Sequence, residues 1–228
     1  MFDFDGLMID SERVLADCIV EVLASRDTYI AVEQFAHLFG STENDDEWEE
    51  LVSTWCEPRL SSAELEALLT PVVRPRVEAL PLLPGVRELL DQAGQAGWKI
   101  GLGTGQSIDR LEPALQRLDV RDRFDAVVTA GEVERGKPAP DVYLEVARRL
   151  HVEPGVCLVL EDSVPGCHAA LSAGMSVVVC PSVTSDRMVF PAEARRVKSL
   201  IDVDLTRLVY EQPGIWGPAS TTMGTTTR

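Results

Sequence analysis

The sequence predicts an α/β fold in which a parallel β-sheet is covered by helices on both faces. From about residue 85 onward, short apolar runs typical of buried strands alternate with segments whose apolar residues recur at helical spacing. Strands and helices in alternation build a doubly wound parallel sheet. Residues 12–80 show no convincing strand pattern. We therefore predict a helical insertion between a first strand and the rest of the sheet.

The first strand is predicted at the start of the chain, in the segment MFDFDGLMID. In an extended strand, Phe2 and Phe4 point to one face, whereas Asp3 and Asp5 point to the other. Only two residues precede Asp3, although a strand usually runs for about five to six residues. We therefore expect neighbouring strands to lack ladder partners and the free amino group to lie near Asp3. We therefore predict that Met1 is either a mis-assigned initiation site or the cause of a stability defect. Four to six apolar residues added before Phe2 should then raise both the melting temperature and the activity of the protein.

The insertion is predicted to consist of amphipathic helices. Three groups of apolar residues keep helical spacing, beginning at Val14, Trp48 and Leu65. Pro81 and Pro84 mark the return of the chain to the sheet. The tail is low in charge and rich in Gly, Thr and Pro, which predicts disorder. The predicted boundaries are residues 1–11 and 81–212 for the core with the sheet, 12–80 for the insertion and 213–228 for the tail.

Four further strands are predicted after the insertion. Each is a short run of apolar residues, many of them β-branched, and each is bounded by glycine or by charged residues. The segments between them place apolar residues three and four positions apart, which indicates helices. The predicted strands cover residues 98–103, 124–129, 156–161 and 176–180.

Composition and charge exclude several classes of protein. The chain has 228 residues, of which 45% are hydrophobic, enough for one core with a smaller domain. The 21 basic and 37 acidic residues give a net charge of −16, which opposes binding to nucleic acid or to an anionic membrane. No apolar run approaches the ~20 residues of a membrane span, and no secretory signal precedes the first strand, so we expect a cytoplasmic protein. The five cysteines lack CxxC spacing and are predicted to be reduced thiols.

Polar residues follow the predicted strands at the points where these strands end. In open parallel sheets, ligands bind outside the carboxyl ends of the strands. Two carboxylate pairs, one hydroxyl and one ammonium group are therefore predicted to converge on one edge of the sheet. They belong to Asp3 and Asp5, Glu161 and Asp162, Thr104 and Lys137.

Four segments, in this order, resemble the motifs of the haloacid dehalogenase superfamily: DFDGLMIDSE, GLGTGQS, GKPAPDVY and EDSVPGCHAALSAGM. The similarity runs over roughly residues 2 to 190, and the chain is similar to the helical-cap subgroup that contains β-phosphoglucomutase and many small-molecule phosphatases. The resemblance implies a Rossmann-like core with residues 12–80 as a cap domain. It also implies a Mg²⁺-dependent phosphatase that acts on a small phosphorylated metabolite through an aspartyl-phosphate, as a monomer or weak dimer.

The resemblance assigns the two acids of the first strand to catalysis. Asp3 is placed to attack phosphorus, which splits one hard displacement into two easier ones. Asp5 can protonate the leaving oxygen and then deprotonate the attacking water. The alternatives are a strand-end Asx turn for Asp3 and a solvated turn carboxylate for Asp5.

A Mg²⁺ ion is the implied cofactor. Asp3, the main-chain carbonyl of Asp5, and Asp162, with Glu161 as a ligand or behind it, would supply the oxygen ligands that Mg²⁺ prefers. A cation at this position would also relieve the repulsion between two carboxylates on one strand face. Alternatively, Glu161 and Asp162 cap the following helix.

Further residues of the motifs are predicted to bind the phosphoryl group. Thr104 can donate its hydroxyl to a phosphoryl oxygen, together with the neighbouring residues Gly105 and Gln106. Lys137 lies in an extended stretch between a glycine and a proline and can neutralise phosphoryl charge. Thr104 could instead be a simple turn residue, and Lys137 an exposed surface lysine.

Three comparisons within the superfamily favour hydrolysis of a phosphomonoester. True dehalogenases lack a second catalytic aspartate two positions after the nucleophile, whereas Asp5 is present here. Mutases similar to β-phosphoglucomutase carry a histidine early in the first cap helix and a basic residue after a glycine in the cap loop. This chain has Leu15 at the first position and acids after Gly40. A sugar phosphomutase and a non-catalytic binding protein on the same fold are the alternatives. The candidate substrate-binding residues of the cap are Arg74 and Arg76.

Overall fold

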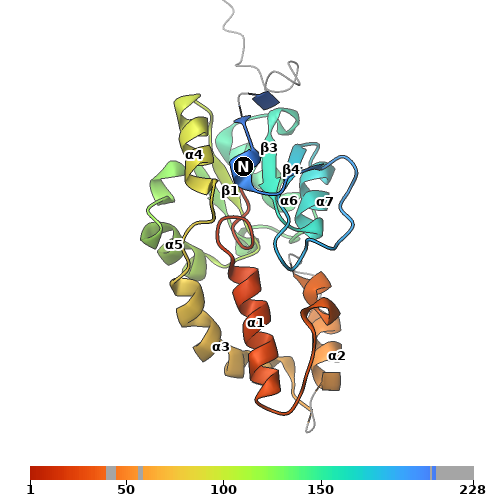
Figure 1. Ribbon diagram of the computed structural model, residues 1–228. Helices are drawn as coiled ribbons and strands as arrows, with labels where there is room; N and C mark the ends of the chain where they lie inside the picture. The colour runs from red at the N-terminus through yellow and green to blue at the C-terminus, as the bar shows by residue number, and fades with distance from the viewer. Residues whose placement is uncertain (40–44, 56–58, 206, 209–228) are drawn as a thin grey trace, which may run out of the picture.

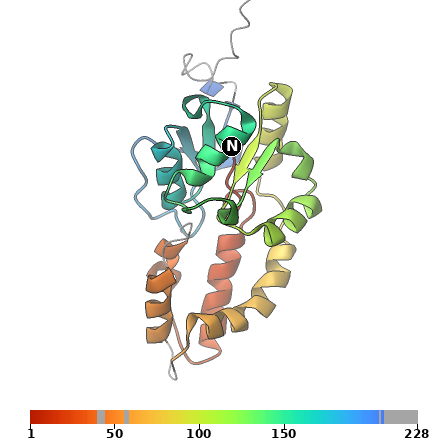
Figure 2. The ribbon, with the colours of Figure 1, turned by 180° about the vertical axis from the view of Figure 1, so that it is seen from behind.

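The structure is a computed structural model that describes residues 1–39, 45–55, 59–205 and 207–208. Its upper part holds a parallel sheet between two layers of helices, and its lower part is a bundle of helices (Figure 1). Figure 2 shows the same division from behind. The predicted disordered tail, residues 213–228, lies outside the described residues. No helix of the described residues is long and apolar enough to cross a membrane.

The sheet contains short parallel strands on either side of the first residues of the chain. The pair β1 and β2 forms one half, and β3, β4 and β5 form the other. Phe2 forms bridges to Leu102 of β1 and Leu160 of β3, which joins the two halves. The strands are β1 (Gly101–Gly103), β2 (Ala126–Val128), β3 (Leu158–Glu161), β4 (Ser176–Val179) and β5 (Arg195–Arg196). The four strands predicted after the insertion are present, and β5 is an additional edge strand.

The helices follow in the predicted alternation with the strands. The α-helices are α1 (Ser11–Ala24), α2 (Asp45–Trp55), α3 (Ser62–Glu78), α4 (Val86–Gln95), α5 (Ile108–Arg117), α6 (Asp141–Leu150) and α7 (Val164–Ser172). Short 3₁₀ turns accompany them: η1 (Val32–Gln34), η2 (Ala36–Leu38), η3 (Arg121–Arg123), η4 (Ala130–Glu132), η5 (Pro154–Val156) and, after β5, η6 (Leu200–Asp202). The α/β fold with a helical insertion after the first strand is thus the fold that the sequence predicts.

Alternating residues of the strands pack into two separate cores, one on each face of the sheet. Leu160 and Val178 face the layer of α4 and α5, whereas Val159 and Val177 face the layer of α6 and α7. This alternation follows from the two-residue repeat of a strand. Because both faces are covered, the strands read as continuous apolar runs in the sequence.

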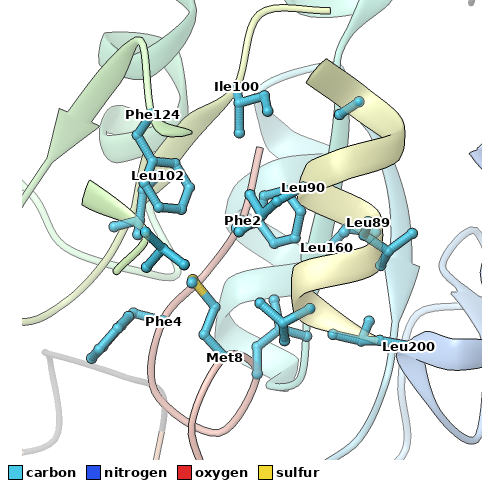
Figure 3. Packing of buried hydrophobic residues seen from close by; sticks show 14 of the residues in the cluster. Phe2, Phe4, Met8, Leu89, Leu90, Ile100, Leu102, Phe124, Leu160 and Leu200 are labelled. Carbon is cyan, nitrogen blue, oxygen red and sulfur yellow. The ribbon is translucent and has the colours of Figure 1, made fainter. Parts of the chain in front are cut away.

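The N-terminal segment lies in the centre of the first core. Phe2 packs among Leu90, Leu102 and Leu160 (Figure 3). Its amide donates to Gly101 O at 2.9 Å, and its carbonyl accepts from the Gly103 amide at 3.0 Å.

Two expectations about the short first strand are wrong. Neighbouring strand residues do find partners there, because the Leu160 amide donates to Met1 O at 2.9 Å and the Asp3 amide donates to Leu160 O at 3.0 Å. The ammonium group of Met1 donates to Leu158 O at 2.7 Å, at the end of the segment opposite to Asp3. The paired segment therefore holds Asp3 at the carboxyl edge of the sheet.

The helical insertion has a core of its own. Residues of α1, α2 and α3, among them Ile19, Val52 and Leu65, are fully buried against one another. The linkers on the two sides of the insertion run next to each other, since the Leu83 amide donates to Met8 O at 2.8 Å. The insertion therefore joins the sheet region through a narrow pair of linkers below the carboxyl edge of the strands (Figures 1 and 2).

Candidate active site

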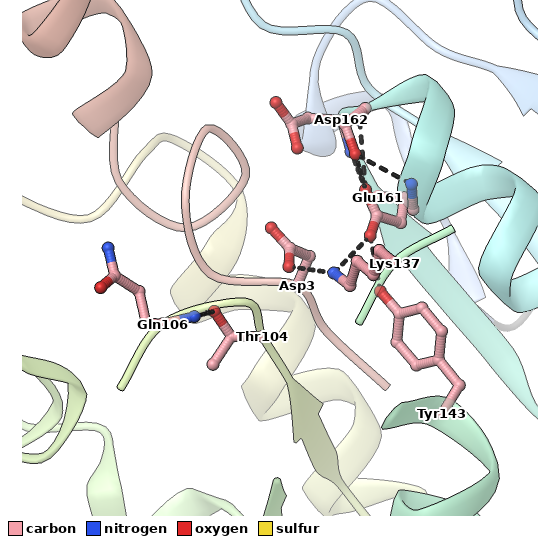
Figure 4. Close-up of polar contacts among 9 residues, drawn as sticks. Asp3, Thr104, Gln106, Lys137, Tyr143, Glu161 and Asp162 are labelled. Carbon is pink, nitrogen blue, oxygen red and sulfur yellow. Dashed lines mark hydrogen bonds and ion pairs between the residues drawn. The ribbon is translucent and has the colours of Figure 1, made fainter. Parts of the chain in front are cut away.

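Asp3, Lys137 and Glu161 form a buried cluster at the carboxyl edge of the sheet (Figure 4). Asp3 ends the central segment, Glu161 ends β3, and Lys137 lies in the loop before α6. Lys137 Nζ donates to Asp3 Oδ1 and, at 2.7 Å, to Glu161 Oε1. Only 4% of the Lys137 residue surface is exposed. The lysine is thus a buried ammonium held between two carboxylates and not an exposed surface lysine.

Both oxygens of the Glu161 carboxylate accept hydrogen bonds from within the protein. Oε1 accepts from Lys137 Nζ and, at 2.6 Å, from the Tyr143 hydroxyl. Oε2 accepts from the amides of Asp162 and Ser163 at 3.0 and 3.1 Å, and from Ser163 Oγ at 3.0 Å. The carboxylate also packs against Gly166, where an added Cβ would lie 1.8 Å from Oε1. Glu161 is therefore anchored within the protein, which suits a residue that lies behind a metal ligand.

The three groups of this cluster shift one another's proton affinity. Burial raises the pKa of Asp3 well above its ordinary value, an effect that the charge of Lys137 opposes and that of Glu161 reinforces. Burial alone would raise the pKa of Glu161 as well, but Lys137 and the hydrogen bond from Tyr143 outweigh it and lower that pKa. Burial alone would lower the pKa of Lys137, but the two carboxylates raise it. Lys137 therefore stays charged.

Asp162 differs from Glu161 because neither of its oxygens has a hydrogen-bond partner among the described residues, although the residue is 1% exposed. Burial, followed by the charges of Glu12 and Glu161, raises its pKa well above the ordinary value, and the nearby Ser182 hydroxyl offsets this only in small part. A buried carboxylate without donors is costly unless a cation pairs with it.

Oxygen atoms of Asp3, Glu161 and Asp162 lie within 4.8 Å of one another. Oxygen ligands of this kind suit Mg²⁺, and the unpartnered oxygens of Asp162 are available to bind it. Gly6 makes room for Asp162, since an added Cβ there would lie 2.1 Å from Asp162 Oδ2. Gly6 also has φ +79°, a conformation that favours glycine. The residues present therefore fit a Mg²⁺ ion.

Asp5 lies outside this cluster and has a different environment. Its Oδ1 accepts a hydrogen bond from Ser11 Oγ at 2.6 Å. Burial raises its pKa, while the hydrogen bonds from Ser11 and Gln106 and the charges of Lys137 and Arg110 oppose that rise. A raised pKa makes a carboxyl group better able to hold a proton and pass it on, which is the property of a general acid.

The loop after β1 brings a hydroxyl to the same edge. The amide of Thr104 donates to Val128 O at 3.1 Å, and its Oγ1 accepts from the Gln106 amide at 3.1 Å. This arrangement leaves the hydroxyl hydrogen of Thr104 available for an acceptor. Thr104 is 1% exposed, whereas Gly105 is exposed and Gln106 is half-buried.

The two cap arginines that we predicted to bind substrate are engaged elsewhere. Arg74 Nε donates to Glu78 Oε1 at 2.8 Å within α3, and Arg76 lies 2.7 Å from Glu21 Oε2 of α1. Both are exposed, and no described contact joins either to the cluster around Asp3. The structure therefore does not bring Arg74 and Arg76 into the site.

Two residues near the site were not singled out from the sequence. Tyr143 follows Lys137 in the segment GKPAPDVY, is fully buried, and places its ring 4.9 Å from Lys137 Nζ. Glu12 ends the segment DFDGLMIDSE, and burial raises its pKa to about 7 despite hydrogen bonds from Thr184 and Ser182. Both belong to segments that we quoted, but their burial depends on residues far along the chain.

Known proteins resemble this chain over most of its length. Residues 1–180 match the family of haloacid dehalogenase-like hydrolases. The chain is 34% identical over 194 residues to hexitol phosphatase B of Escherichia coli K12, covering 80% of this chain and 82% of that one. It is 32% identical over 184 residues to the fructose-1-phosphate phosphatase of the same organism, which covers 78% of this chain and 93% of that protein. The solved β-phosphoglucomutase of Clostridium difficile has a TM-score of 0.72 at 20% identity, covering 92% and 94%, which is a likeness of fold.

Proposed function

The chain belongs to the haloacid dehalogenase-like hydrolase family, and from this premise we propose that it is a Mg²⁺-dependent phosphatase of small phosphomonoesters that works through an aspartyl-phosphate. The observation that carries the proposal is the pairing of a lysine-bound carboxylate, Asp3, with a buried carboxylate that has no donor, Asp162. The first is a nucleophile fixed in place, and the second is a ligand available to a cation.

The proposed reaction has two displacements at phosphorus. Asp3 attacks, and the bond between phosphorus and the alcohol oxygen of the substrate breaks while Asp5 gives that oxygen a proton. Asp5 then takes a proton from a water molecule, whose oxygen attacks phosphorus and breaks the bond to Asp3. Inorganic phosphate leaves, and both carboxyl groups return to their starting states. The raised pKa of Asp5 supports its role as the proton donor.

Lys137 and Thr104 stabilise the charge that develops on the phosphoryl oxygens. Lys137 stays protonated because it lies between two carboxylates, and the free hydroxyl hydrogen of Thr104 serves as a further donor. Asp3, the main-chain carbonyl of Asp5 and Asp162 would hold a Mg²⁺ ion, which would supply further positive charge at the phosphoryl group. Glu161 holds Lys137 and the start of α7 in place behind these ligands.

The helical insertion, residues 12–80, acts in this proposal as a cap domain over a core formed by residues 1–11 and 81–212. Its separate core allows it to move as a unit, and closure of such a unit excludes water from a reacting phosphoryl group. The cap also lies where the part of the substrate beyond the phosphate would extend. The substrate class that we propose is a phosphorylated sugar or polyol, because the relatives named above are phosphatases of such compounds.

A panel of phosphorylated metabolites tests this function. We expect phosphate release from one or more sugar or polyol phosphates, with Mg²⁺ required and EDTA inhibitory. Asp3→Asn should abolish turnover, whereas Asp122→Asn, the same change at an exposed residue, should leave it intact. Activity retained in the Asp3→Asn variant would contradict the aspartyl-phosphate. Conversion of β-glucose 1-phosphate to glucose 6-phosphate, given a bisphosphate activator, would show a mutase instead.

A further inference from the structure

A buried carboxylate beside the site has no part in the mechanism above. Glu12 is the second residue of α1, where the chain passes from the sheet region into the helical insertion, and it is 7% exposed. Its Oε2 accepts hydrogen bonds from Thr184 Oγ1 at 2.6 Å and from Ser182 Oγ at 3.0 Å. Both bonds end on the same oxygen, so Oε1 has no donor among these hydroxyls.

Glu12 approaches Asp162 across the bare backbone of Gly6. A Cβ on Gly6 would lie 2.1 Å from Asp162 Oδ2 and 3.2 Å from the carboxyl carbon of Glu12. The carboxyl group of Glu12, from α1, and that of Asp162, which follows β3, therefore both lie next to Gly6. Neither oxygen of Asp162 has a hydrogen-bond partner within the described part of the chain. The Ser182 hydroxyl, which donates to Glu12, also lies near Asp162 and lowers its pKa slightly, but burial and the charge of Glu12 outweigh this effect. Two neighbouring buried carboxylates repel each other unless a cation lies near both.

A cluster of hydroxyl groups fixes the relative position of these two acids. Ser182 Oγ lies 2.8 Å from Thr184 Oγ1 and 3.1 Å from Ser185 Oγ. Ser185 Oγ in turn donates to the main-chain carbonyl of Asp162 at 2.6 Å. The same loop therefore holds the side chain of Glu12 and the backbone of Asp162. The two hydrogen bonds to Oε2 fix the orientation of the Glu12 carboxylate, so the position of its other oxygen, Oε1, is fixed as well.

We propose that Glu12 is an outer carboxylate of the metal centre, which raises the affinity of the site for Mg²⁺ without binding the ion directly. It would do so by adding negative charge beside Asp162 and by accepting a hydrogen bond from the hydration shell of the ion. Glu12 is thus a positioning residue, because no described contact joins it to Asp3 or Lys137. This inference rests on one part of the proposed function, namely that the cluster of Asp3, Glu161 and Asp162 binds Mg²⁺.

Titration of the protein with Mg²⁺ alone, followed by calorimetry, tests this role without substrate. Glu12→Gln keeps the shape and the acceptor oxygen but removes the charge, and it should raise the Mg²⁺ dissociation constant by about 10- to 100-fold, the usual effect of losing an outer partner. Glu12→Asp keeps the charge and should bind Mg²⁺ more tightly than Glu12→Gln. Glu193→Gln, the same change at an exposed residue, should bind Mg²⁺ like the wild type.

A second variant addresses the anchoring hydroxyls. Thr184→Val leaves the Glu12 carboxylate in place but removes its closest donor, so it should also weaken Mg²⁺ binding. One outcome would contradict the proposal: Asp162→Asn loses Mg²⁺ binding, but Glu12→Gln and Thr184→Val bind Mg²⁺ with wild-type affinity. Glu12 would then have only a packing role in the fold. Phosphate release measured in parallel separates the two proposals. A wild-type protein that hydrolyses phosphomonoesters without binding Mg²⁺ would overturn the inference and the metal requirement, but not the hydrolase.

Discussion

Lys137 Nζ lies 2.7 Å from Glu161 Oε1 in an environment where both side chains are almost completely buried. The same ammonium group also pairs with Asp3. Lys137 therefore compensates the charge of two carboxylates at once: Asp3, which is proposed as the nucleophile, and Glu161, which accepts hydrogen bonds from the amides of Asp162 and Ser163. Its removal would leave both as buried charges without a counter-ion, a situation that typically costs about 3–5 kcal/mol.

We predict that Lys137→Met lowers both stability and turnover. The free energy of unfolding should fall by about 3 kcal/mol because two buried carboxylates lose their partner. The turnover number should fall by at least about 10²-fold because the charge on the phosphoryl group loses a donor. Lys198→Met, at an exposed position, is the matched control for denaturation and steady-state assays. A Lys137→Met protein as active as this control would exclude Lys137 from the reaction.

Tyr143 offers a finer test, because its hydroxyl and its ring have separate contacts. The hydroxyl donates to Glu161 at 2.6 Å, while the ring lies under Lys137. Tyr143→Phe removes only the hydroxyl, so we expect a loss of about 1.5–3 kcal/mol in unfolding free energy, the usual contribution of a hydrogen bond to a charged group. The activity should fall by about 10-fold because Glu161 loses a positioning partner.

The matched control for this variant is Tyr29→Phe, which removes a hydroxyl from a residue that is 80% exposed. Tyr143→Leu removes the ring as well and should be less stable than Tyr143→Phe. Chemical denaturation gives the unfolding free energies, and assays at saturating Mg²⁺ give the activity. If Tyr143→Phe equals the wild type in both, the hydroxyl does not position Glu161.

Several of these relationships could be predicted from the sequence, and others could not. Asp3, Thr104 and Glu161 lie at or just beyond the carboxyl ends of strands, so the geometry of a parallel sheet predicts that they meet, and the structure brings them to one edge. Lys137 was also expected at this edge, because it follows the strand predicted at residues 124–129 after a short loop, and the structure places it there. Their chemical roles stay predictions until variants are measured.

Tertiary contacts explain what sequence patterns did not predict. The strand β5 consists of Arg195 and Arg196, whose charge is atypical of a strand, and it forms only because Val178 and Val179 offer an edge. Glu12 is buried by hydroxyls about 170 positions away along the chain, and local sequence carries no sign of that contact. Arg76 pairs with Glu21 of another helix, which is likewise a tertiary contact. The pair of Arg74 with Glu78 is local, and its i,i+4 spacing could have been read from the sequence.

The proposed metal site leads to a prediction about stability as well as activity. Without a cation, Asp162 is a buried carboxylate with no donor, which costs free energy. Asp162→Asn should therefore raise the melting temperature in EDTA above that of the wild type while abolishing turnover. Mg²⁺ should raise the melting temperature of the wild type, by the equivalent of about 2.7 kcal/mol at a concentration 100 times its dissociation constant, and should leave that of Asp162→Asn unchanged.

Thermal denaturation with EDTA and with Mg²⁺ is sufficient to measure these effects. Asp122→Asn controls for the loss of a carboxylate at an exposed position. An Asp162→Asn variant that melts below the wild type in EDTA would mean that Asp162 stabilises the fold through a contact other than a metal ion. A wild type whose melting temperature does not respond to Mg²⁺ would argue against a metal at this cluster.

The contacts between the helical insertion and the sheet region predict that the two parts move as rigid bodies. Within the described residues, two exposed ion pairs cross between them: Arg187 with Glu33 at 2.9 Å, and Arg110 with Glu66 at 3.8 Å. Exposed pairs of this kind contribute only about 0–1 kcal/mol each and are weakened by salt. The separate apolar core of the insertion means that little burial is lost when the parts separate. The hinges should lie near residues 10–12 and 80–85, where the chain leaves and rejoins the sheet.

Small-angle scattering with and without a phosphate mimic such as orthovanadate, in the presence of Mg²⁺, measures this movement. We expect a smaller radius of gyration with the mimic, because a bound phosphoryl group gives the insertion something to close upon. The Asp162→Asn variant should not respond, since it lacks a ligand of the proposed metal. Glu33→Gln should shift the profile in the absence of the mimic toward a larger radius, because it removes one of the ion pairs between the two parts. Identical profiles for the free and mimic-bound wild type would mean that the insertion is fixed and that substrates reach Asp3 without its movement.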